Sequence, residues 1–411
     1  MAIVKPFKAV RPSRDKAALV SSKSYEAYTP AELGAKLNFN PFSFLHILHP
    51  DYKYHQEVAS EQRFELVKKK YKEFKSNAYF TKDDKPAFYI YQNNTPTKSY
   101  CGIISAIAAE DYHNNAIKKH EDTLQKREVL FEKYYKKTGF NAEPVLLTYP
   151  DNDVIENVIK KHQLERPEFE FTTTDKNTHF LWVIDDDDEI NLISEAFKNI
   201  AILYIADGHH RTTSSCLLAK KLAAENKNHT GNEPYNYFMS YLLPESQVDI
   251  YEFNRFIRDL NGLTSTEFIE ELSKVFTIQK KYQEIFKPSE KNQFSMYFDG
   301  EFYALRLKKS VYKNTNELSK LDAQILVTTV LKPILGINDI RNDSKIIYSQ
   351  NKTGSLELKT KVDTGEFKVS FGMLPTTIEE LKNIVDADLL MPPKTTFIEP
   401  KLRNALTIYE L

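Results

Sequence analysis

The sequence predicts an α+β protein that consists of two domains. The chain of 411 residues is too long for one ordinary hydrophobic core. Strand-like apolar runs and helical periodicity both recur along it, and the pattern changes beyond Tyr241. We therefore expect a catalytic core with insertions over residues 1–250 and a second α+β domain over residues 251–411. The tail of the second domain, residues 391–402, is expected to return to the cleft of the core.

Composition excludes several classes of protein. The hydrophobic fraction of 41% supports a folded core and excludes global disorder. Lys and Arg number 56 against 57 Asp and Glu, so there is no basic excess to attract nucleic acid or an anionic membrane. Residues 1–16 contain no apolar signal-peptide region, and no run of about 18 apolar residues occurs. We therefore expect a cytoplasmic protein that does not contact a membrane.

In the first domain, local sequence signals identify the following elements. Thr29-Pro30 with Glu32 is typical of a helix start, and the turn residues Asn93-Asn94-Thr95-Pro96 indicate a hairpin. The four aspartates at 185–188 favour a solvated turn that ends a strand. A divalent-cation site is the less favoured alternative. The pattern predicts strands over 3–10, 87–92, 102–107, 145–149, 179–184 and 201–206, and helices from Thr29, within 56–75, over 121–137 and from Leu217 to Glu225.

The second domain shows fewer but clear signals. Asp299-Gly300 separates two apolar runs and predicts a hairpin. We expect strands over 248–253, 293–298 and 302–307 and a helix over 266–275. The proline-rich segment 391–401 is polar but stiff, unlike a frayed end.

The strongest chemical signal is the segment Asp207-Gly208-His209-His210-Arg211-Thr212-Thr213. An apolar strand precedes it and a helical segment follows it. A glycine turn before a helix directs backbone N–H groups and the positive end of the helix dipole at one point, which favours an anion. Arg211 adds a donor suited to phosphate, His209 and His210 add further donors, and Asp207 is suited to Mg²⁺ or to accepting a proton. The alternative is a strand-to-helix turn with capping residues, which the clustering of these side chains disfavours.

Other enzyme signatures are absent from the sequence. It contains no P-loop, no Gly-x-Gly-x-x-Gly and no Gly-x-Ser-x-Gly motif. Leu124 stands where a zinc-protease helix would need its second histidine. Cys101 and Cys216 form no Cys-x-x-Cys pair, and Cys216 is expected to be a buried apolar residue rather than a nucleophile.

The chain also resembles a known family. It is similar to a bacterial and archaeal domain-of-unknown-function family of the ParB/sulfiredoxin superfamily, which is related to free serine kinases. The resemblance spans nearly the whole chain and rests on Ala206-Asp207-Gly208-His209-His210-Arg211, Lys5-Pro6-Phe7, Asn40-Pro41, His120-Glu121-x-Thr123 and Pro393-Lys394-Thr395-Thr396-Phe397-x-x-Pro400-Lys401. It implies a mixed-sheet ParB/sulfiredoxin-like core enlarged by insertions. A doubly wound sheet is the alternative, and it requires parallel neighbours on both sides of the strand before Asp207.

The resemblance implies roles for individual residues. It gives Gly208, His209, Arg211, Thr212 and Thr213 contacts to phosphate or nucleotide, and it gives His210 and Asp207 catalytic roles, with Asp207 as a magnesium ligand. The family commonly reads Pro-Pro-Tyr-Asp in its first loop, where this chain has Lys23-Ser24-Tyr25-Glu26. Glu26 is therefore a candidate for the carboxylate that accepts the substrate proton, with a surface glutamate as the alternative. Further expected contacts to substrate or phosphate are His120, Glu121, Thr123, Arg127, Lys394, Thr395, Thr396 and Lys401.

These observations lead to three functional hypotheses. The first is a kinase that uses Mg²⁺ and ADP or ATP to phosphorylate the hydroxyl of a small metabolite, with free L-serine as the best guess. The second is a ParB-like nucleotide-binding or DNA-binding switch without turnover, which the balanced charge disfavours. The third is a metal-dependent phosphoester hydrolase that uses water as the acceptor.

Overall fold

The fold comes from a computed structural model, which describes residues 1–24, 27–52, 59–350 and 356–411. The described chain divides into two compact units. Unit 1 comprises residues 1–119, 123–248 and 400–411, and unit 2 comprises residues 120–122 and 249–399. Unit 2 is thus inserted between two segments of unit 1.

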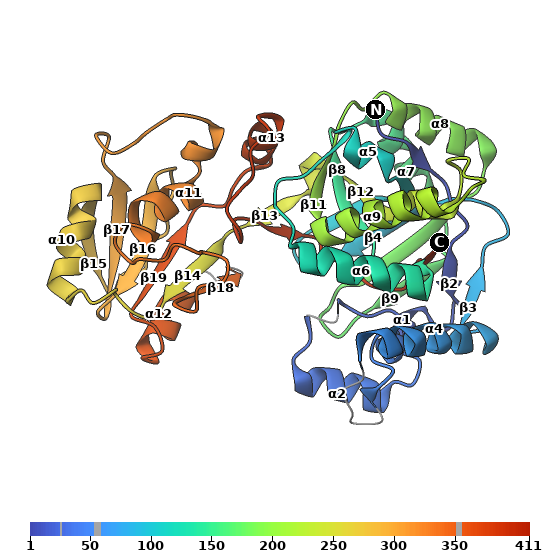
Figure 1. The fold of residues 1–411 in the computed structure, drawn as a ribbon, viewed down its shortest axis with the longest axis horizontal. Coiled ribbons are helices and arrows are strands. Elements are labelled where there is room, and N and C mark those ends of the chain that lie inside the picture. Colours follow the sequence, from blue (N-terminus) through green and yellow to red (C-terminus); the bar gives the residue numbers. More distant parts are fainter. Residues whose placement is uncertain (25–26, 53–58, 351–355) are drawn as a thin grey trace. The chain divides into compact units, whose positions relative to one another are not determined.

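Unit 1 is built on one large mixed sheet (Figure 1). Its strand order is β6-β11-β8-β12-β5-β4-β10-β9, and β1 pairs with β5. These strands are β1 Val4–Lys5, β4 Phe88–Asn94, β5 Ser99–Ala108, β6 Ile117–Lys118, β8 Val145–Tyr149, β9 Phe169–Thr172, β10 Thr178–Ile184, β11 Leu203–Asp207 and β12 Tyr237–Pro244. Two short pairs complete the unit, β2 Val10–Pro12 with β3 Phe80–Lys82 and β7 Phe140–Asn141 with β21 Tyr409–Glu410.

The helices of unit 1 cover this sheet and its edges. α6 and α9 pack side by side in front of the sheet in Figure 1. The helices are α1 Ala17–Val20, α2 Pro30–Phe39, α3 Leu45–Leu48, α4 Ser60–Ser76, α5 Glu110–His113, α6 Gln125–Thr138, α7 Asp153–Gln163, α8 Asp187–Lys198 and α9 His209–Glu225.

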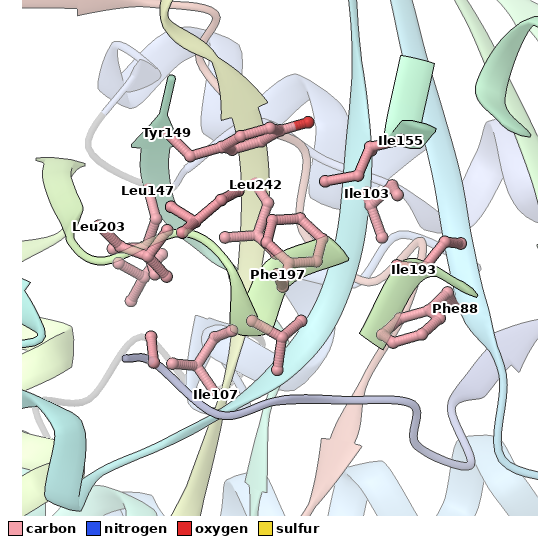
Figure 2. Close-up of a cluster of buried hydrophobic side chains, with 14 of the residues drawn as sticks. Phe88, Ile103, Ile107, Leu147, Tyr149, Ile155, Ile193, Phe197, Leu203 and Leu242 are labelled. Carbon is pink, nitrogen blue, oxygen red and sulfur yellow. The ribbon is translucent and has the colours of Figure 1, made fainter. Parts of the chain in front are cut away.

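Apolar side chains from strands and helices form the main core of unit 1. Figure 2 shows Leu147 and Tyr149 of β8 packed with Leu242 of β12 and Phe197 of α8. All four are at most 1% exposed, so this contact holds α8 on the sheet by burial of apolar area. A second core lies under α3 and α4 and contains Val10, Phe44, Ile47, Val67, Phe74 and Ile408.

Unit 2 contains a six-stranded sheet in which every pair is antiparallel. Its order is β15-β17-β16-β19-β14-β18, and a separate ribbon joins β13 to β20. The strands are β13 Asp249–Tyr251, β14 Phe253–Ile257, β15 Phe276–Tyr282, β16 Gln293–Phe298, β17 Glu301–Leu307, β18 Ile346–Gln350, β19 Val369–Met373 and β20 Phe397–Glu399. The helices are α10 Ser265–Val275, α11 Asp322–Leu326, α12 Leu356–Asp363 and α13 Ile378–Asp386.

Several expected elements occur where the sequence placed them. The β4–β5 and β16–β17 hairpins form around the predicted turns. Thr29 and Glu32 form a capping box at the start of α2. The aspartate run ends β10, and Asp186 caps α8 by accepting the Glu189 N–H.

Four expectations differ from the structure. The helix expected from Leu217 begins at His209, because the chain enters it directly after the left-handed Gly208. The strand expected over 3–10 is split into β1 and β2 because Pro6 has no N–H to donate to a ladder. The helix expected from residue 121 begins only at Gln125, because the His120 carbonyl instead accepts the Met391 N–H within unit 2. The doubly wound alternative is wrong, since β11 has a parallel neighbour in β6 and an antiparallel neighbour in β8.

Within the ranges that the structure describes, no helix is both long enough and apolar enough to cross a membrane.

Candidate functional site

The Asp207 turn connects β11 to α9 and sets the geometry of the site. The register of β11 against β8 shifts between Ile205 and Asp207, which is a bulge that re-aims the end of the strand. Gly208 then has φ 97° and ψ 29°, a left-handed conformation that side chains rarely adopt. A Cβ at Gly208 would lie 2.9 Å from Nε and from Nη2 of Arg211. Glycine therefore allows both the turn and the close approach of the guanidinium.

Four charged side chains meet at this turn. Arg211 Nη1 forms an ion pair with Glu143 Oε1, and Arg211 Nη2 lies 3.5 Å from Asp207 Oδ2. Lys401 Nζ lies 3.3 Å from Asp207 Oδ1. The Arg211 side chain is 14% exposed, whereas those of Asp207 and Lys401 are 41% and 43% exposed. The half-buried Glu143 contact fixes the guanidinium, and the exposed carboxylate of Asp207 and ammonium of Lys401 are accessible to a ligand.

The charge of Arg211 also reaches the neighbouring helix. Burial raises the pKa of the Tyr135 hydroxyl on α6 to about 12, and the positive charge of Arg211 opposes this shift. On α9 itself, burial raises the pKa of the Cys216 thiol, and the residue is 1% exposed. The expectation that Cys216 is a buried apolar residue is confirmed.

The remaining residues of the motif occupy the first turns of α9. His209 is 8% exposed. Thr212 is fully buried, and its hydroxyl donates to the Gly208 carbonyl over 3.2 Å. The Thr213 hydroxyl donates to the His209 carbonyl over 3.1 Å and lies 3.3 Å from the Tyr112 hydroxyl. Thr212 therefore shapes the turn from inside, whereas Thr213 is only half-buried.

Thr123 and Arg127 lie at the start of α6, which is hydrogen-bonded to α9. The Thr123 hydroxyl donates to Glu128, and the Glu128 carbonyl accepts a bond from the Ser214 hydroxyl over 3.0 Å. Arg127 is in the first turn of α6, where its N–H donates to the Leu124 carbonyl. The start of α6 is thereby attached to the helix that follows the Asp207 turn.

Other predicted residues belong to unit 2. His120 Nε2 lies 3.2 Å from the Thr396 hydroxyl, so the structure brings these two together. The Thr395 hydroxyl donates to the Pro392 carbonyl over 2.6 Å. Lys394 has a positive φ of 57°, and its ammonium lies 5.5 Å from the centre of the Phe253 ring. Glu121 is also part of unit 2. Glu26 lies outside the described residues.

Sequence reasoning missed Glu143. This residue lies just before Pro144 and the first residue of β8. Because β8 pairs with β11, Glu143 is close to the last residues of β11. A charged residue at a strand boundary is common, and only the pairing of β8 with β11 shows that Glu143 faces Arg211. Two cavities, of about 320 and 550 Å³, lie elsewhere in unit 1, and none of residues 207–213 lines them. The candidate site is therefore a surface cluster of charges rather than a deep cavity.

Comparisons with known proteins cover most of the chain. A family model described as "Protein of unknown function (DUF1015)" matches residues 4–324. None of the curated proteins compared with the chain matches it. The matched range includes the whole Asp207 turn and ends before the segment that carries Lys394 and Lys401.

Three solved structures are weakly similar to this chain. A free serine kinase in complex with AMP is 15% identical, covers 73% of this chain and 88% of its own, and has a TM-score of 0.36. SbnI with C-terminal truncation from Staphylococcus aureus is 11% identical, with coverages of 74% and 87% and a TM-score of 0.41. A conserved hypothetical protein from Pyrococcus furiosus is 16% identical, with coverages of 74% and 95% and a TM-score of 0.35.

Proposed function

The chain belongs to the DUF1015 family, and we propose that it is a nucleotide-dependent phosphotransferase that phosphorylates the hydroxyl of a small metabolite. Free L-serine is the acceptor that we propose, with ADP or ATP as the donor. The similarity of the Asp207 turn to that of the free serine kinases, seen in the sequence, motivates this choice. We also propose that the mixed sheet of unit 1 is a ParB/sulfiredoxin-like core.

One observation carries the proposal. Asp207, Arg211 and Lys401 converge at the N-terminus of α9, directly after a left-handed glycine. Helix N-termini attract phosphate through their N–H groups and dipole. Phosphoryl transfer needs mainly positioning and neutralisation of charge, which this arrangement supplies without a deep pocket.

Each charged residue has a separate role in the proposal. Arg211, oriented by Glu143, donates guanidinium hydrogen bonds to phosphate oxygens. Lys401 adds a second cation, and its exposed side chain can move from Asp207 to the ligand. His210 stabilises the charge that develops on the transferred group, and Gly208 with His209 approaches the phosphate through the backbone.

Asp207 fits a magnesium role of a limited kind. It offers one half-exposed carboxylate, and Mg²⁺ is commonly bound by one or two carboxylates together with substrate phosphates. Two cations already lie near this carboxylate, so we expect Mg²⁺ to bind with the nucleotide rather than before it. When bound, the ion would neutralise the charge of the phosphates.

The proposed transfer is chemically balanced. The acceptor oxygen forms a bond to the terminal phosphorus of the nucleotide, and the bridging P–O bond breaks. AMP leaves from ADP, or ADP leaves from ATP, with the electron pair. The hydroxyl proton goes to a carboxylate, for which Glu26 remains the candidate. His120, Glu121, Thr123, Arg127, Lys394, Thr395 and Thr396 remain proposed contacts to substrate or phosphate.

The test is ³¹P NMR of the full chain with Mg²⁺ and L-serine, first with ADP and then with ATP. We expect a phosphomonoester signal that Asp207→Asn lacks and that the control variant Asp185→Asn keeps, because Asp185 is exposed and lies outside the site. Release of inorganic phosphate alone would instead identify a hydrolase. No turnover with either nucleotide, tested with serine and with other hydroxylated metabolites, would contradict the kinase proposal.

A further inference from the structure

A second polar cluster lies in unit 1, around Arg403. Arg403 Nε donates to the Ser21 hydroxyl over 3.1 Å, and Arg403 Nη2 donates to the Ser21 carbonyl over 2.7 Å. A guanidinium has five N–H donors, so these bonds leave several available. Among the residues that the structure describes, no carboxylate lies within ion-pair distance of Arg403. A half-buried arginine with this environment is suited to an anionic ligand.

The other neighbours of Arg403 do not balance its charge. The guanidinium lies 5.9 Å from the centre of the Phe171 ring, which in turn lies 5.1 Å from the ring of His179. His179 is neutral, because burial and the charge of Arg403 lower its pKa to about 3. The nearby Asp175 is paired with Lys23 over 2.9 Å. None of these described neighbours balances the positive charge of Arg403 through an ion pair.

Buried polar atoms without a partner accompany this charge. Asn404 and Ser22 form a β-bridge, in which the Asn404 N–H donates to the Ser22 carbonyl over 2.7 Å. Both residues are 2% exposed, and neither Ser22 Oγ nor Asn404 Oδ1 has a hydrogen-bond partner. Buried polar atoms are normally satisfied by protein, water or ligand. Ser22 Oγ can donate a hydrogen bond, and Asn404 Oδ1 can accept one.

The cluster is continuous with the Asp207 turn through a short stretch of chain. Lys401, two residues before Arg403, lies 3.3 Å from Asp207. The segment 401–404 therefore places one end at the proposed phosphate site and the other at the unpartnered polar atoms. A small acceptor bound between them would present its hydroxyl to the phosphate and its opposite end to Arg403.

We propose that Arg403, Ser22 and Asn404 form a subsite for the carboxylate and amino groups of an α-amino acid acceptor. Arg403 and the Ser22 hydroxyl bind the carboxylate, whose single charge matches one guanidinium. Asn404 Oδ1 accepts a hydrogen bond from the ammonium. This inference rests on the proposed phosphotransferase function and assigns the residues that hold the carboxylate and amino groups of its acceptor.

The test uses isothermal titration calorimetry to compare the affinities of the full chain for carboxylates and for the corresponding amides. The probes are L-serine against L-serinamide and L-alanine against L-alaninamide, with ADP and Mg²⁺ absent so that no turnover occurs. We expect the carboxylate of each pair to bind roughly tenfold or more tightly, because a charge-assisted hydrogen bond is lost in the amide. Arg403→Gln should remove this preference, and Arg403→Lys should restore part of it.

A matched control separates this subsite from a nearby cavity. Arg14 lines the cavity of about 320 Å³ together with Phe171, so Arg14→Gln removes a second arginine from the surroundings of Phe171. We expect Arg14→Gln to keep the preference for carboxylates. If Arg14→Gln abolishes the preference, or if no carboxylate binds more tightly than its amide, the assignment to Arg403 is wrong.

Two further measurements keep the test decisive. If Arg403→Gln unfolds, Ser22→Ala offers a milder change, and we expect it to weaken L-serine binding while ADP affinity changes less than about twofold. An unchanged L-serine affinity in a folded Ser22→Ala variant would show that water alone occupies this position. A carboxylate preference without any phosphorylated product would overturn the proposed kinase and leave the subsite standing.

Discussion

Gly208 shows how a single residue controls the candidate site. Its left-handed backbone turns the chain from β11 into α9, and its missing side chain leaves room for Arg211 at 2.9 Å from where a Cβ would be. The scarcity of glycine, 11 in the whole chain, made this position conspicuous in the sequence. The sequence could not show that Arg211 is held by Glu143, because that contact depends on the pairing of β8 with β11.

Gly208→Ala should affect both the stability of the protein and its affinity for ADP, and the two effects can be measured separately. We expect a loss of about 1–2 kcal/mol in the free energy of unfolding, and a displaced Arg211 that weakens ADP binding. Gly231→Ala is the matched control, because Gly231 has φ 87° but open space where its Cβ would lie. Urea unfolding and ADP titration of both variants check this. Equal loss of ADP affinity in the two variants would contradict the role given to Arg211.

A second residue-scale prediction concerns Asp322 in unit 2. Asp322 is 2% exposed, its Oδ1 accepts the Asn292 N–H over 2.8 Å, and its Oδ2 has no partner. Burial raises its pKa to about 6. Because the folded pKa lies above the unfolded value of about 3.9, the folded state binds the proton more tightly, and this contribution to stability grows as pH falls from about 6 to about 4.

Asp322→Asn should therefore stabilise the protein at pH 7 by about 1 kcal/mol, since it removes a buried charge. The advantage should disappear by about pH 4, where the aspartate is itself protonated. Urea unfolding at pH 7, 5.5 and 4 measures the difference, with Asp185→Asn as an exposed control. A constant difference across this range would mean that Asp322 does not titrate in it.

At the scale of elements, sequence signals succeeded where the cause is local. Thr29 with Glu32 forms the capping box that the sequence indicated, and Asp299-Gly300 forms the β16–β17 turn. Local sequence signals predicted an element wrongly where a hydrogen bond to a distant segment determines where it begins. The delayed start of α6 depends on Met391, which binds the His120 carbonyl from 271 residues away along the chain (391 − 120). No local pattern around His120 contains that information.

The capping box of α10 offers a test at this scale. The Thr264 hydroxyl accepts the Glu267 N–H over 3.3 Å, and Glu267 accepts the Thr264 N–H over 2.8 Å. Thr264→Ala should lower the free energy of unfolding by about 1 kcal/mol, because it leaves helix N–H groups without acceptors. Thr266→Ala, an exposed change two residues later, should stay within about 0.5 kcal/mol of the parent. Similar effects from both variants in thermal unfolding would rule out a specific cap.

At the scale of the whole molecule, unit 2 is an insertion with adjacent ends. The chain leaves unit 1 after Val248 and re-enters it at Pro400. Asp249 and Glu399 are directly opposite each other in the antiparallel β13–β20 ribbon, so the two connections lie side by side. The main core of unit 1 contains no residue between 249 and 399. The sequence placed a boundary near residue 250 and predicted a returning tail at residues 391–402, but only the contacts of the folded chain assign residues 400–411 to unit 1.

Removal of residues 249–399 should therefore leave a folded unit 1. Opposed residues in an antiparallel pair are about 5 Å apart, so a linker of two or three residues can join Val248 to Pro400. We expect this variant to retain a cooperative thermal transition followed by circular dichroism. It should lose catalytic activity, because the proposed contacts of Lys394, Thr395 and Thr396 are deleted. A variant that is expressed but shows no cooperative transition would mean that unit 1 depends on unit 2.

The return of the chain at Pro400 also determines which unit can complete its contacts first during translation. Lys401 reaches Asp207, Ile408 bridges to Val10, and β21 pairs with β7, so unit 1 lacks these contacts until residues 400–411 have left the ribosome. All of unit 2 from Asp249 onward emerges earlier, and domains generally fold as units during translation. The inserted unit can thus fold before the unit that surrounds it. A nascent chain that ends before Lys401 carries an incomplete charge cluster, so any activity of this site requires the segment 400–411.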